Sequence, residues 1–168
     1  MNKWDTFAVI VGGASAALLG LLFVAISIRI SVIAGSAEFR SRAAQTLVLF
    51  GMVLLLSVLL AVPGQPRQAL GVEVITLAVL SGVGLSLLGR RASRAAGQQR
   101  ISRVLDIVSP NTITTALLLV AGILIAVGLD AGLYVMVAPV IAAFVGGLTS
   151  AWLFMTRIDD QAADQVGT

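Results

Sequence analysis

The chain contains five long apolar runs separated by short polar segments. The runs cover residues of about 7–28, 46–62, 69–89, 112–129 and 133–155. A transmembrane helix needs roughly 20 mainly apolar residues, and within lipid each backbone amide must find its partner inside the same segment. The pattern predicts an all-α integral membrane protein, with a single transmembrane helical domain of about five spans over residues 1–157. We expect the polar C-terminal tail at 158–168 to be disordered.

Positive charges follow alternate apolar runs, and this predicts the orientation. One set of segments carries Arg29, Arg40, Arg42, Arg90, Arg91, Arg94, Arg100, Arg103 and Arg157, whereas the other carries Lys3, Asp5, Arg67 and Asp130. Because short cytoplasmic loops are enriched in Lys and Arg, we predict an N-terminus outside and a C-terminus in the cytoplasm. If the fourth run is re-entrant instead, the C-terminus lies outside.

The third connection contains a short amphipathic segment at 100–108. Its apolar residues recur at helical spacing, as expected for an interfacial helix. Arginines in and before this segment are candidates for contact with anionic lipid headgroups, and they are Arg90, Arg94, Arg100 and Arg103. The alternative is that these arginines serve only to fix the topology.

The composition mainly argues against particular classes of protein and of functional site. Of the 168 residues, 58% are hydrophobic and 11% are charged, whereas about a quarter of the residues in a soluble domain are charged. The chain has neither cysteine nor histidine, so we expect no thiolate or imidazole metal site, no disulfide and no cofactor. No serine has an evident base beside it, and catalysis is disfavoured. The arginines lie between apolar runs, which argues against a nucleic-acid partner.

Small residues recur at four-residue spacing in the first and last runs. The candidates are Gly12, Gly13, Ala16 and Gly20 in the first run, and Ala143, Gly146 and Ser150 in the last. Such stripes let two membrane helices approach closely. They predict either packing within one chain or a subunit interface, and in the second case the chain associates with itself.

Glu73 is the single carboxylate inside an apolar run. At helical spacing it shares one face with Thr76, Gly84 and Arg91, which gives a candidate pathway from a carboxylate to a guanidinium. An ionisable residue within a membrane segment is a functional hypothesis by default. The alternative is that Glu73 extends to the outer headgroups and that Arg91 follows the charge rule for cytoplasmic loops.

Residues 13–28 of the first run resemble the opening helix of small uncharacterised multi-pass membrane proteins of actinobacteria, some of which are labelled as modulators of the FtsH protease. The resemblance implies an accessory role in a bacterial cytoplasmic membrane. From the residues, the leading hypothesis is a non-enzymatic, homo-oligomeric small ion channel or permeation pore in the lipid bilayer. The alternative is an accessory protein that modulates another membrane complex, such as a membrane protease.

Overall fold

The structure is a computed structural model that describes residues 3–28, 30, 35, 37–95 and 110–166, and within these residues it is helical without strands. The helices are α1 (Lys3–Ile28), α3 (Ala37–Ala61), α4 (Arg67–Ala95), α6 (Pro110–Ala126), α7 (Ala131–Val135) and α8 (Val137–Val166). Four segments are long and apolar enough to cross a membrane, and they lie in α1, α3, α4 and the α7–α8 pair. The apolar helix α6 has 17 residues, or about 26 Å, slightly less than the hydrocarbon core of about 30 Å.

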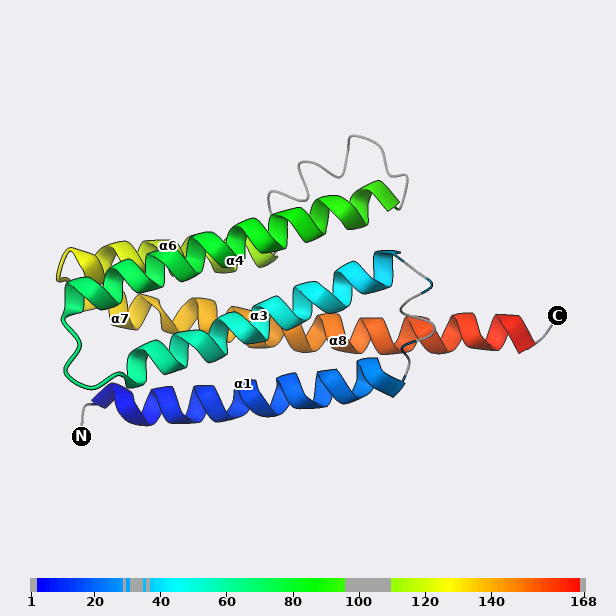
Figure 1. Ribbon diagram of the computed structural model, residues 1–168, viewed down its shortest axis with the longest axis horizontal. Helices are drawn as coiled ribbons and strands as arrows, with labels where there is room; N and C mark the ends of the chain where they lie inside the picture. The colour runs from blue at the N-terminus through cyan, green and yellow to red at the C-terminus, as the bar shows by residue number, and fades with distance from the viewer. Residues whose placement is uncertain (1–2, 29, 31–34, 36, 96–109, 167–168) are drawn as a thin grey trace.

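The long helices run side by side, and the two chain ends lie at opposite ends of the bundle (Figure 1). Helix α3 is central, because it packs against α1, α4 and α8, while α6 packs against α4 and α8. The largest fully buried side chains include Phe50 and Leu56 on α3, Leu118 on α6 and Met136 before α8. The apolar core is therefore built from α3, α4, α6 and α8, and α1 lies at its edge.

The last predicted span is interrupted between α7 and α8 at Met136. Pro139, which is fully buried, is the fourth residue after Val135. A proline has no amide hydrogen to donate to the carbonyl four residues earlier, and its ring clashes with that carbonyl. The Met136 amide still donates to the Gly132 carbonyl at 3.0 Å. The break between α7 and α8 is thus explained by the proline, and the two helices form one membrane-length segment.

Helix α6 ends in a turn that requires glycine. Gly128 has a φ of +90°, and its amide donates to the Ile125 carbonyl at 2.9 Å, while the Leu129 amide donates to the Leu124 carbonyl at 2.9 Å. These two bonds form a Schellman motif, in which the left-handed residue after the helix is usually glycine. The motif reverses the chain from α6 into α7.

Two helices extend beyond the predicted apolar runs. Helix α3 begins at Ala37 rather than near residue 46, and α4 continues to Ala95 rather than ending near residue 89. Hydropathy marks only the part of a helix that lies in hydrocarbon, whereas a helix with Arg40 or Arg42 in its first turns can continue into the headgroup layer. The interfacial helix predicted at 100–108 lies outside the described residues.

The prediction of a disordered tail is wrong for most of its length, because α8 continues to Val166. The segment at 153–166 contains no Gly or Pro. A helix that has already formed extends at little cost through residues such as Ala and Gln. The end of α8 consequently projects beyond the ends of the other helices (Figure 1). Its segment after Trp152 has a length of about 21 Å at 1.5 Å per residue.

Candidate functional site

The predicted pathway residues lie on α4, and Glu73 is the most informative of them. It lies six residues after Arg67 at the start of the helix, or about 9 Å along its axis. Its side chain is half-buried, and its Oε2 accepts a hydrogen bond from Nε2 of Gln65 in the turn between α3 and α4. This bond replaces part of the hydration that the carboxylate loses at the membrane surface.

The remaining pathway residues continue along the same helix. Thr76 is exposed on α4, and its hydroxyl donates to the Val72 carbonyl at 2.8 Å. A Cβ atom added to Gly84 would meet nothing within 4 Å, and the neighbouring Leu80 is 67% exposed. The face of α4 that carries Thr76, Leu80 and Gly84 therefore points away from the described helices of its own chain. Arg91 belongs to α4, but its side chain lies outside what the structure describes.

A cross-helix ion pair lies at the same end of the bundle as Glu73. Arg67 Nη1 at the start of α4 donates to Asp130 Oδ1 in the turn before α7. The two side chains are 59% and 70% exposed. A second cross-helix contact at this end joins α1 to α7, since the Trp4 and Tyr134 rings meet edge-on at 5.3 Å between centroids. These contacts tie the ends of α1, α4 and α7 together.

We predict a small coupling energy between Arg67 and Asp130, of about 0.2–1 kcal/mol, because both side chains are exposed and solvent screens their attraction. A double-mutant cycle with Arg67→Ala and Asp130→Ala, read as the free energy of unfolding in detergent micelles, measures it. The coupling should shrink in high salt. A value well above this range, or one insensitive to salt, would contradict the prediction.

The predicted small-residue stripes divide between the interior and the surface. A Cβ atom on Gly12 would lie 2.6 Å from the Ser57 Oγ, so this glycine lets α1 approach α3. Ala143 is buried in the core. The other members are open: nothing lies within 4 Å of a Cβ on Gly13, Gly20 or Gly146, and Ala16 and Ser150 are exposed. Gly12 and Ala143 thus serve packing within the chain, and a subunit interface at the open positions stays a prediction.

A close approach between α4 and α6 involves glycines that the sequence analysis did not single out. A Cβ atom on Gly71 of α4 would lie 2.5 Å from the Ala126 Cα of α6, and one on Gly122 of α6 would lie 3.0 Å from the Ile75 backbone nitrogen. Further along, a Cβ on Gly82 would lie 2.7 Å from Thr115 Cγ2. The signal was the spacing of Gly71 and Gly82, which are three helical turns apart on one face of α4.

Three buried serine hydroxyls within the helices have local partners. Ser15 donates to the Val11 carbonyl at 2.7 Å, Ser57 to the Leu54 carbonyl at 2.7 Å, and Ser81 to the Leu77 carbonyl at 2.7 Å. In the part of the chain that the structure describes, each buried side-chain nitrogen or oxygen has a hydrogen-bond partner. Such back-bonded hydroxyls are compatible with hydrocarbon, which supplies no water to satisfy them.

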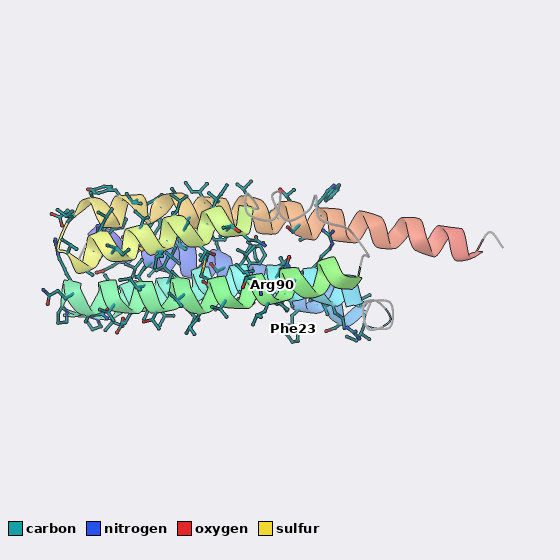
Figure 2. The ribbon with its side chains drawn as sticks, turned by 90° about the horizontal axis from the view of Figure 1, so that it is seen from above. Phe23 and Arg90 are labelled. Carbon is teal, nitrogen blue, oxygen red and sulfur yellow. The ribbon has the colours of Figure 1, made fainter. Side chains whose placement is uncertain are left out.

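The predicted headgroup contacts are described only in part. The side chain of Arg90 is exposed near the end of α4 (Figure 2). Arg94 belongs to α4, although its side chain is outside the description, and Arg100 and Arg103 lie outside the described residues. The described ranges contain no group of three or more Asp, Glu, His or Cys residues that could hold a metal ion.

Three features of the described residues are candidates for function: an outward face of α4 with a half-buried carboxylate, open small-residue surfaces on α1 and α8, and exposed arginines at the opposite end from the Arg67–Asp130 pair. Comparisons of the chain with protein-family models, with curated proteins and with solved structures found no match.

Proposed function

We propose that the protein is a homo-oligomeric pore of a bacterial cytoplasmic membrane, with the α4 face of Glu73, Thr76 and Gly84 lining a path between subunits. The observation that carries the proposal is that this face includes a half-buried carboxylate and an exposed hydroxyl, while a Cβ on Gly84 meets no other helix. Exposing a carboxylate to the hydrocarbon of the lipid costs free energy. A second copy of the chain would cover the face and enclose the polar groups.

The charges support the proposed orientation, with the N-terminus outside and the C-terminus in the cytoplasm. Arg40 and Arg42 at the start of α3 and Arg90 near the end of α4 lie at the end of the bundle where the chain terminates. At the other end, Arg67 is neutralised by Asp130. Arg40, Arg42 and Arg90 support a cytoplasmic position for their end of the bundle under the positive-inside rule.

We predict that purified protein in liposomes passes monovalent cations, and that Glu73→Gln lowers cation over anion selectivity several-fold. A carboxylate at a pore mouth attracts cations, and the amide removes that charge while keeping the shape. Flux is measured with ion-sensitive dyes and reversal potentials.

Asp130→Asn is the matched control, because it also converts a carboxylate to an amide at the same end of the bundle but lies off the α4 face. Its selectivity should equal that of the unchanged protein. Flux at the level of empty liposomes would end the pore proposal, and an equal effect of both substitutions would remove Glu73 from it.

The second candidate function is an accessory role on another membrane complex, and the surface of α1 favours it. Helix α1 packs mainly on α3, and its small residues Gly13, Ala16 and Gly20 are left open. Crosslinking in native membranes from a photoreactive residue at Gly20 separates the two candidates. One dominant hetero-partner supports the accessory role, whereas contacts between copies of this chain support the pore.

A further inference from the structure

Three exposed arginines lie at one end of two adjacent helices: Arg40 and Arg42 in the first turns of α3, and Arg90 near the end of α4. We call these three residues the arginine rim. The buried Ser41, between the two α3 arginines, donates a hydrogen bond across the helices to the Leu88 carbonyl of α4. This bond between antiparallel neighbours holds Arg40 and Arg90 at nearly the same height along the bundle.

The height of the arginine rim matches the headgroup layer of a bilayer. Arg67, whose pair with Asp130 marks the opposite end, and Arg90 are 23 residues apart on α4, or about 35 Å at 1.5 Å per residue. The hydrocarbon core of a membrane is about 30 Å thick, and headgroups extend the total to about 40–45 Å. If Arg67 lies in one headgroup layer, Arg90 must lie in the other, at the level of the lipid phosphates.

Apolar side chains continue from the arginine rim toward the middle of the bundle. On α4, Leu87 is 52% exposed and Leu80 is 67% exposed, one and three turns before Arg90. On α1, Phe23 projects away from the bundle in the same half as Arg90 (Figure 2). A molecule with a phosphate and a long hydrocarbon chain is complementary to this order of charged and apolar surfaces, whereas free phosphate uses only the charged part.

We propose that the arginine rim binds the phosphates of anionic phospholipid headgroups, with an acyl chain of the lipid at Arg90 lying against Leu87 and Leu80. Guanidinium groups donate paired hydrogen bonds to phosphate oxygens and carry a permanent positive charge. Arginines near an anionic membrane surface also attract it electrostatically. This lipid site does not rest on the pore proposal, and near Leu80 an acyl chain and a second copy of the chain would compete for the same surface of α4.

The experiment counts lipid bound to the full-length protein in neutral detergent by native mass spectrometry, with phosphatidylglycerol and zwitterionic phosphatidylcholine as probes. The unchanged protein should prefer phosphatidylglycerol. Arg40→Gln, Arg42→Gln and Arg90→Gln together should weaken its binding by about fivefold at each arginine. Arg67→Gln is the matched control from the opposite end, and it should leave binding unchanged.

Two further measurements distinguish loss of charge from misfolding, and a lipid ligand from free phosphate. Lysine at the same three positions keeps the charge, so the lysine variant should retain most of the affinity for phosphatidylglycerol. This variant keeps the proposal testable if the glutamine variant fails to fold. Millimolar inorganic phosphate should not displace the lipid, and displacement would mean that the site takes free phosphate. Equal lipid binding by the glutamine variant and the unchanged protein, equal loss in Arg67→Gln, or no preference for phosphatidylglycerol would overturn the proposal.

Discussion

Gly71→Ala is expected to lower the free energy of unfolding by about 2 kcal/mol, although alanine is a better helix former than glycine by up to about 1 kcal/mol. The added methyl group would lie 2.5 Å from the Ala126 Cα of α6, whereas carbon atoms in ordinary contact are about 3.5–4.0 Å apart. Both atoms are held by helix backbone, so no side chain can rotate to make room. Helices α4 and α6 must separate by about 1 Å.

This separation propagates because the contact between α4 and α6 is continuous. Gly122 of α6 packs against the Ile75 backbone, and Gly82 of α4 packs against Thr115. Moving α6 away from Gly71 opens these contacts as well, and dispersion attraction falls steeply with distance. Packing is the main attraction between helices in lipid, since burial of apolar surface supplies little there.

Gly84→Ala is the matched control on the same helix, because nothing lies within 4 Å of a Cβ at that position. It should leave stability unchanged or raise it slightly through helix propensity. Reversible unfolding in mixed micelles by titration with a denaturing detergent compares the two variants. If Gly71→Ala is as stable as Gly84→Ala, α4 and α6 do not meet at Gly71.

The membrane-length helices could be predicted because hydrocarbon imposes one requirement on every residue that it contains. Apolar runs of about 20 residues satisfy it, and α1, α3, α4 and the α7–α8 pair have that length. Helix ends obey no such rule. The α3 segment that contains Arg40 and Arg42 is helical, and so is the acidic end of α8, since polar residues outside hydrocarbon can be helix or coil.

Helix partners were harder to predict than helices. Gly12 and Gly71 both lie in apolar runs, yet one lies against the Ser57 side chain and the other against the Ala126 backbone. A small residue permits close approach without specifying which helix approaches. The same limit applies to the candidate site: the sequence placed Glu73 on a face of α4, but its bond to Gln65 depends on how the turn after α3 folds.

The outward direction of that face also had to come from the fold. Periodicity groups Glu73, Thr76 and Gly84 together, but it does not say whether they point into the bundle or away from it. Gly71 and Gly82 decide the question, because they turn a different side of α4 toward α6. The path proposed for this protein therefore needs a second subunit.

Gly147→Leu is expected to destabilise the protein by about 2–3 kcal/mol through overpacking between α8 and α3. A Cβ atom at this position would lie 2.6 Å from the Cζ atom of Phe50. The Phe50 ring is itself only 2% exposed and lies against the Phe144 ring, with 6.2 Å between the centroids. A leucine side chain must displace Phe50 or force α8 away from α3, and either change disrupts the core.

Gly146→Leu tests the neighbouring position with the same substitution, and its expected result differs in kind. A Cβ on Gly146 would meet nothing within 4 Å, so the protomer should remain as stable as the unchanged protein or gain slightly from helix propensity. If Gly146 lies in a subunit interface, the added side chain should instead weaken self-association, measured by energy transfer between labelled copies in liposomes. If Gly146→Leu destabilises the protomer as much as Gly147→Leu does, the orientation of α8, with Gly147 facing α3 and Gly146 facing away, is contradicted. Unchanged energy transfer would exclude the α8 surface at Gly146 from the oligomer and leave the open surface of α1 at Gly13 and Gly20 as the remaining small-residue contact.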